Sequence, residues 1–130
     1  NKTMKLTNQE ILNFLNSGIV NKKLPVRVGY AVSVNTEEFS SKVKAYEKQR
    51  EILLEKYAEK DEKGKPAVEG AQYKIKDAEN WNKDVKELLE TETEVNVTTC
   101  TLDDLAKCDS SDFDSLTVLE LSVLKFMIEK

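Results

Sequence analysis

Hydrophobic residues recur at spacings of three and four along residues 36–60, which predicts the longest helix of the chain. The stripe consists of Phe39, Val43, Tyr46, Arg50, Leu53 and Tyr57. Thr36 is the expected N-cap, and the two glutamates that follow it would offset the positive end of the helix dipole. We expect Tyr46 and Leu53 in the core, so that Leu53→Ala would cost about 2–5 kcal/mol.

Just before this helix the hydrophobic period changes to two. Valines and Tyr30 alternate with small or polar residues between Val26 and Val34. Such alternation predicts a strand with one buried face, and Pro25 suits its first position, where a missing donor costs least. Residues 94–100 are rich in β-branched side chains and predict a second strand that partners the first.

Helix caps mark the remaining elements. Thr7 and Glu10 have the spacing of a capping box and predict a first short helix that ends near Gly18. Asp77 is the expected N-cap of a helix that returns antiparallel to the long one, and Thr101 starts a further helical turn. Residues 61–76, between the two longer helices, are expected to form an exposed loop or a small hairpin.

The last helix, which starts near Ser115, is apolar almost all round and must be buried centrally or cover a partner. Its C-terminal part gives a candidate self-association surface, formed by Leu124, Phe126, Met127 and Ile128. We therefore expect a homodimer or a partner-bound state. The fold class is α+β in a single domain over residues 1–130: a long helix, a shorter antiparallel helix, a small sheet of two to three strands, and terminal helices.

Composition limits the class of protein. The chain has 130 residues, of which 39% are hydrophobic and 34% charged, and no apolar run approaches the roughly 20 residues that span a bilayer. The start lacks the apolar core of a secretory signal, and residues 1–5 are expected to be disordered or foreign to the native protein. Free thiols are favoured over a disulfide for the two cysteines, Cys100 and Cys108.

Several chemistries are disfavoured, and we expect no catalytic, metal or cofactor site. Histidine, the commonest general base and metal ligand, does not occur, and neither does a glycine-rich phosphate loop. With only two arginines, the chain is poorly equipped for direct nucleic-acid binding. A carboxylate-dependent hydrolase that uses Asp103 and Asp104 remains a weak third hypothesis, which their replacement by Asn would test.

Acidic residues concentrate in residues 87–114, where nine carboxylates accompany one lysine. This stretch could imitate a phosphate backbone and inhibit a host defence or nucleic-acid enzyme. A charged rim that keeps the domain soluble is the simpler interpretation. The candidate partner surface consists of Glu90, Glu92, Glu94, Asp103, Asp104, Asp109, Asp112 and Asp114.

Five segments together carry a family resemblance: Met4–Glu10, Lys23–Val26, Leu54–Tyr57, Lys60–Gly64 and Leu124–Ile128. In their order they resemble an uncharacterised family of small phage and prophage proteins of Gram-positive bacteria. The resemblance implies a phage or prophage source, without a signal peptide, in the host cytoplasm or associated with the virion. It transfers no catalytic residue. We therefore expect a non-catalytic protein that acts through protein–protein contacts, in virion morphogenesis or as an accessory factor.

Overall fold

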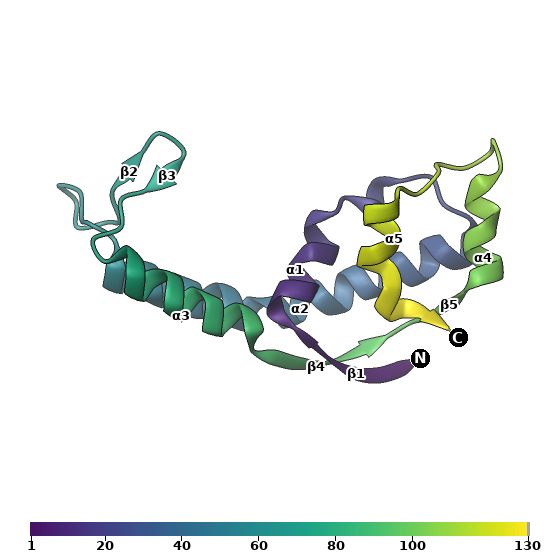
Figure 1. The fold of residues 1–130 in the computed structure, drawn as a ribbon, viewed down its shortest axis with the longest axis horizontal. Coiled ribbons are helices and arrows are strands. Elements are labelled where there is room, and N and C mark those ends of the chain that lie inside the picture. Colours follow the sequence, from purple (N-terminus) through teal and green to yellow (C-terminus); the bar gives the residue numbers. More distant parts are fainter. Residues whose placement is uncertain (130) are drawn as a thin grey trace. The chain divides into compact units, whose positions relative to one another are not determined.

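The fold, seen in a computed structural model that describes residues 1–129, is α+β as predicted (Figure 1). The helices are α1 (Asn8–Asn16), α2 (Val26–Tyr57), α3 (Ala78–Glu90), α4 (Leu102–Ala106) and α5 (Val118–Leu124), with 3₁₀ turns η1 (Ile19–Asn21), η2 (Lys107–Asp109) and η3 (Lys125–Met127). The strands are β1 (Lys2–Thr7), β2 (Val68–Glu69), β3 (Gln72–Tyr73), β4 (Glu92–Val97), β5 (Cys100–Thr101) and β6 (Ile128–Glu129).

Internal contacts divide the chain into two compact units. Unit 1 comprises Asn1–Val43 and the chain from Glu92 onwards, and unit 2 comprises Lys44–Thr91. Helix α2 contributes residues to both units. The sequence predicted one domain over residues 1–130 and gave no sign of this division, so each unit is described by itself.

Helix α2 begins ten residues earlier than predicted, and the strand expected at residues 26–34 does not form. The buried positions of this stretch are Val28, Ala31, Val32, Asn35 and Phe39, which have the spacing of a helix face. Val26 and Tyr30 completed the apparent alternation, but their side chains are 86% and 66% exposed. Thr36 is therefore inside the helix and not its cap, and its hydroxyl donates to the carbonyl of Val32.

The strand predicted at residues 94–100 is confirmed in part as β4, but its partner is β1 at the start of the chain. The two strands are antiparallel, with Lys2 opposite Val97 and Thr7 opposite Glu92. Leu6, Val95 and Val97 are buried on the inner face of this two-stranded sheet. The expectation of a disordered start at residues 1–5 is wrong, because residues 2–5 pair with β4.

Two side chains of α2 bind the edge of β4 that faces away from β1. The amide of Asn35 accepts a hydrogen bond from the backbone N–H of Thr98 at 2.8 Å and donates one to the carbonyl of Thr98 at 2.9 Å. One turn later, the carboxylate of Glu38 accepts from the backbone N–H of Asn96 at 2.8 Å. These contacts hold the strand against the helix. The two side chains bond to backbone groups that a third strand would otherwise use.

The core of unit 1 is built around three phenylalanine rings. Phe14 of α1 meets Phe39 of α2 edge-on at 5.2 Å between centroids, and Phe126 of η3 lies 5.5 and 5.4 Å from these two rings. Leu124 and Met127 are fully buried beside them. Burying one large apolar side chain stabilises a fold by about 1.5–3 kcal/mol. The C-terminal segment, which supplies these side chains, is therefore part of the core.

Two of the helix starts predicted in unit 1, at Thr7 and Thr101, are confirmed. Thr7 and Glu10 form a capping box at α1, in which the Thr7 hydroxyl accepts from the Glu10 N–H and the carboxylate returns a bond to the Thr7 N–H. Thr101 and Asp104 form the same arrangement at α4. A third capping box, not predicted, opens α5.

Unit 2 is a helical pair closed by a hairpin. Helix α3 returns beside the C-terminal part of α2, and Asp77 caps it as predicted. The Tyr57 hydroxyl donates to Asp84 at 2.6 Å, and Trp81 packs edge-on against the Tyr57 ring. Residues 61–76 were predicted to form either an exposed loop or a small hairpin. The structure shows a hairpin, formed by β2 and β3.

The Asn35 contacts predict a large loss of stability on truncation. Asn35→Ala would leave the N–H and C=O of Thr98 without their partners in a partly buried site, at a cost of about 2–4 kcal/mol. Thr36→Ala, at the next position of the same helix, should change the free energy of unfolding by less than about 0.5 kcal/mol. Urea unfolding of both variants measures the difference; equal effects would contradict the role assigned to Asn35.

The stripe of the long helix needs one correction, because Leu54 and not Leu53 is the buried leucine. Leu54 is 7% exposed, whereas Leu53 is only half-buried. We expect Leu54→Ala to cost about 2–4 kcal/mol and Leu53→Ala about 1 kcal/mol. Thermal and urea unfolding of the two variants would decide between the assignments, and a larger loss for Leu53→Ala would restore the original one.

Candidate protein-contact surfaces

No group of carboxylates and cysteines among residues 1–129 is arranged to hold a metal ion. Cys100 and Cys108 are buried free thiols. Burial, with the charge of Asp104 as a second cause, raises the pKa of Cys100 to about 11, and burial also raises the pKa of Cys108. Because the thiolate is the nucleophilic form, neither cysteine is set up for catalysis.

The eight carboxylates of the predicted partner surface have different roles in the fold. Glu90 lies on α3 in unit 2, and the others lie in unit 1. Asp104 is buried in its capping box, where bonding from the Thr101 N–H lowers its pKa. Asp114 accepts from the backbone N–H of Lys23 at 2.7 Å and returns a bond to the Lys23 carbonyl.

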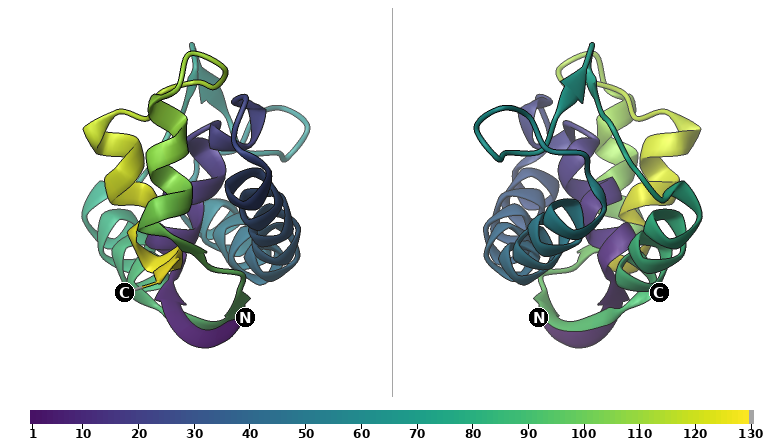
Figure 2. Two further views of the ribbon diagram at one scale, coloured as in Figure 1. Left: turned by 90° about the vertical axis from the view of Figure 1, so that its right-hand side faces the viewer. Right: turned by 90° about the vertical axis from the view of Figure 1, so that its left-hand side faces the viewer.

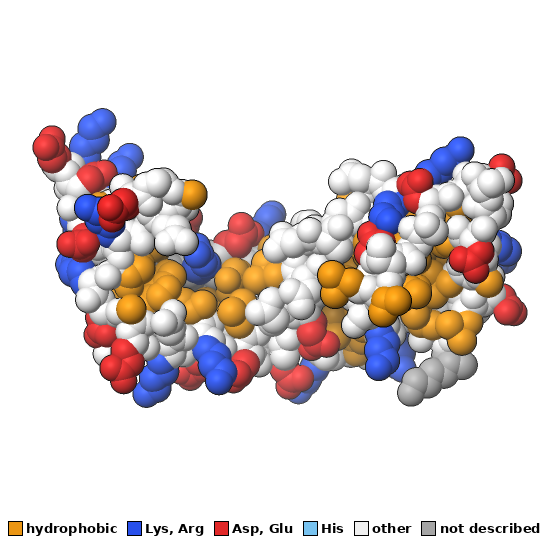
Figure 3. All heavy atoms as spheres, turned by 45° about the horizontal axis from the view of Figure 1, so that its top comes forward, with side chains coloured by type: hydrophobic (Ala, Val, Ile, Leu, Met, Phe, Trp, Pro, Cys, Tyr) orange, Lys and Arg blue, Asp and Glu red, His pale blue; other side chains and the backbone are white. Residues whose placement is uncertain are grey.

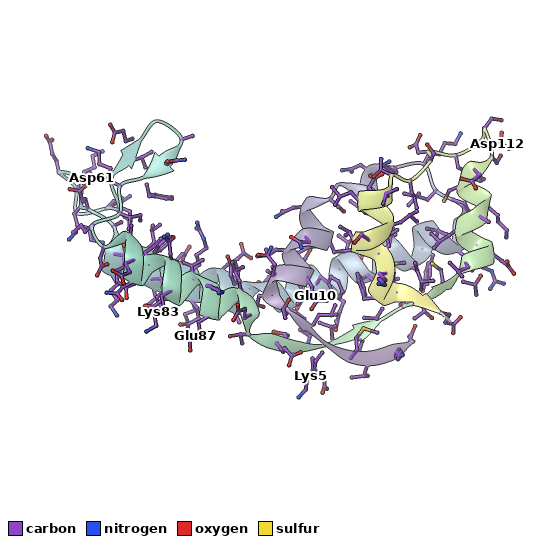
Figure 4. The ribbon with its side chains drawn as sticks, in the orientation of Figure 1. Lys5, Glu10, Asp61, Lys83, Glu87 and Asp112 are labelled. Carbon is purple, nitrogen blue, oxygen red and sulfur yellow. The ribbon has the colours of Figure 1, made fainter. Side chains whose placement is uncertain are left out.

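The other five carboxylates of that surface are exposed: Glu92, Glu94, Asp103, Asp109 and Asp112. The glutamates project from the outer face of β4, whereas Asp112 lies in the loop beyond α4 (Figure 4). Two of the eight carboxylates thus serve the fold itself. Fewer of these carboxylates are therefore free to contact a partner than the sequence predicted.

Two of the four predicted self-association residues, Leu124 and Met127, are buried in the core of unit 1. Leu124 and Met127 have no exposed surface, and Phe126 packs between two other phenylalanines. Ile128 pairs with Cys100 in the parallel β5–β6 ladder. Leu124 and Met127 could enter an interface only if the core opened, whereas Phe126 and Ile128 keep part of their surface exposed.

Elsewhere on the C-terminal helix, apolar side chains do reach the solvent. Val118 is 85% and Leu119 is 75% exposed. Leu119 also borders an open groove of about 870 Å³, whose other apolar walls are Val123, Phe126 and Ile128. Two lysines and two glutamates line this groove. Its charge therefore favours neither an anionic nor a cationic ligand.

The most distinctive surface is the hairpin of unit 2, which we define as residues 58–76. Backbone hydrogen bonds order this hairpin. Glu59 donates to the carbonyl of Lys74 and accepts from the N–H of Ala67, and the N–H of Lys74 donates to the carbonyl of Ala67. Asp61 holds the preceding loop by accepting from the N–H groups of Lys63 and Lys65. Gly70 has φ +64°, which the tight turn between β2 and β3 requires.

This ordered hairpin buries almost nothing. Val68 and Tyr73 are a cross-strand pair on one face, and they are 58% and 45% exposed. Apart from Ala58, no residue of the hairpin is buried, and hydrophobic side chains are visible at the surface around it (Figure 3). A two-stranded hairpin is marginal in water without a packed face. Its apolar pair is therefore a candidate contact point for another protein.

The sequence left residues 61–76 open between a loop and a hairpin, and it did not single out Val68 or Tyr73. The search for relatives adds nothing to this picture: no protein-family model, curated protein or solved structure matches the chain. No helix within residues 1–129 combines the length and apolarity needed to cross a membrane.

The acidic residue that anchors the C-terminal helix gives a pH-dependent prediction. Glu120 receives a 2.7 Å bond from Lys22, whose ammonium also donates to the Ser115 carbonyl. Bonding from Lys22 lowers the pKa of Glu120, so the contribution to stability is present above the carboxyl's unfolded pKa and is lost as the pH falls through the folded-state value.

Lys22→Met should therefore destabilise the fold by about 0.5–1 kcal/mol at pH 7 and by less at about pH 2, measured by urea unfolding. Lys86→Met is the matched control, because its ion pair with Glu90 is exposed and 3.9 Å long, and should have little effect at either pH. An equal loss for Lys22→Met at both pH values would show that the carboxylate is not involved.

Proposed function

We propose that the chain is a non-catalytic protein that acts through protein–protein contacts, with the hairpin of unit 2 as a main contact element. The observation that carries this proposal is the exposed pair Val68–Tyr73 on an ordered hairpin without a core of its own. Aromatic residues are favoured at protein interfaces because they bury a large area and lose little conformational freedom. The phage or prophage origin, with a role in virion morphogenesis or as an accessory factor, rests on the sequence resemblance.

The small core of unit 2 supports the same assignment. The buried apolar residues there are Tyr46, Leu54, Tyr57 and Ala58, all from α2 or the residue after it. Helix α3 contributes none, since Trp81 and Val85 remain partly exposed. A helical pair with so little burial is a low-stability region, and regions of this kind commonly carry binding surfaces. A partner that covers the hairpin would add the missing burial.

The test is co-purification from lysate of phage-infected Gram-positive cells, with identification by mass spectrometry. We expect a partner protein whose recovery falls about fivefold or more when Val68 and Tyr73 are both replaced by threonine, which keeps strand propensity. The matched control replaces Val26 and Tyr30 by threonine, a valine–tyrosine pair in unit 1 that is even more exposed, and should leave recovery unchanged. Recovery that depends on the control pair and not on the hairpin would refute the proposal.

A further inference from the structure

The two edges of the β1–β4 sheet differ in how their backbone groups are used. The N–H groups of Asn96 and Thr98 point away from β1, because they donate to Glu38 and Asn35 of α2. In an antiparallel pair, residues directly opposite each other either bond to each other or both point outward. Thr3 is opposite Asn96, so its backbone groups point outward from β1.

The same parity applies two residues further along β1, at Lys5, which lies opposite Glu94. Thr3 and Lys5 are both exposed, and no described residue hydrogen-bonds to their backbone on the outer side. In two views at right angles to Figure 1, β1 lies at the margin of unit 1 (Figure 2). Among the described residues, α2 closes the edge of β4 and nothing closes the edge of β1.

The charges along β1 indicate what this edge would accept. Lys2 and Lys5 form no ion pair with another described residue, and Lys5 points away from the body of unit 1 (Figure 4). The strand that β1 already pairs with on its inner edge carries Glu92 and Glu94. Opposite charges on neighbouring strands are favourable, and like charges are not. A second copy of β1 would bring four lysines together and is disfavoured.

We propose that the outer edge of β1 binds an extended, acidic segment of another protein, which adds to the sheet as a third strand. Main-chain hydrogen bonds at Thr3 and Lys5 supply affinity, and the lysines select acidic side chains in the added strand. This surface belongs to unit 1 and involves no residue of the hairpin, so its test does not depend on the function proposed above.

The experiment uses the full chain and two fluorescein-labelled peptides. One has the sequence of residues 91–98, TETEVNVT, and the other, TKTKVNVT, replaces its glutamates by lysines. We expect the acidic peptide to bind, with an affinity that falls as salt rises, and the lysine peptide not to bind. Fluorescence anisotropy measures both, and amide hydrogen exchange should show added protection at Thr3 and Lys5.

Three variants separate strand addition from simple charge attraction. Thr3→Pro removes an outward N–H without touching the ladder to β4 and should weaken binding about tenfold. Lys5→Glu should weaken binding of the acidic peptide about tenfold and allow the lysine peptide to bind. Thr3→Val, which keeps the N–H, should bind like the wild type. Thermal unfolding confirms that each variant is folded.

Three results would overturn the proposal. Failure of the acidic peptide to bind at millimolar concentration would mean that the lysines only protect an edge from aggregation. Unchanged binding to a folded Thr3→Pro variant would show charge attraction without strand pairing. Sedimentation of the free chain as a dimer that Thr3→Pro dissociates would assign the edge to a second copy.

Discussion

The structure of unit 1 depends on one helix that completes a sheet with side chains. Asn35 and Glu38, one turn apart on α2, bind the backbone of β4 at Thr98 and Asn96. This requires residues 26–39 to be helical, since in a strand neither the spacing nor the direction of the two side chains would match alternate residues of β4. It also fixes the rotation of β4, which places Val95 and Val97 in the core. The buried amide of Asn35 therefore links the positions of the strand, the helix and the core.

The sequence predicted what local signals encode. The caps at Thr7, Asp77 and Thr101 are right because a capping motif is contained within about four residues. The strand predicted at residues 26–34 is wrong because its alternation counted only large hydrophobic residues. Ala31 and Asn35 occupy core positions, and including them restores the helical period. Pro25 did not discriminate, because proline suits the start of a helix as well as that of a strand.

Several side-chain roles that the sequence missed join distant parts of the chain. Asp114 was assigned to an acidic surface, but it binds the backbone of Lys23, 91 residues away, and Asn35 and Thr98 are 63 residues apart. Periodicity and capping contain no information about such pairs. The last helix shows the same limit: its apolar composition predicted either burial or an interface, and the structure buries Leu124 while it exposes Val118.

The surfaces that matter most are those where folding leaves a favourable contact unmade. A charged side chain in water is already well solvated, so an exposed acidic loop gains little from a partner. An exposed apolar pair such as Val68 and Tyr73 gains by being covered, and an open strand edge gains directed hydrogen bonds. The chain closes the edge of β4 with its own side chains and leaves the edge of β1 open. That asymmetry, together with the coreless hairpin, favours these two elements over the acidic stretch as sites of recognition.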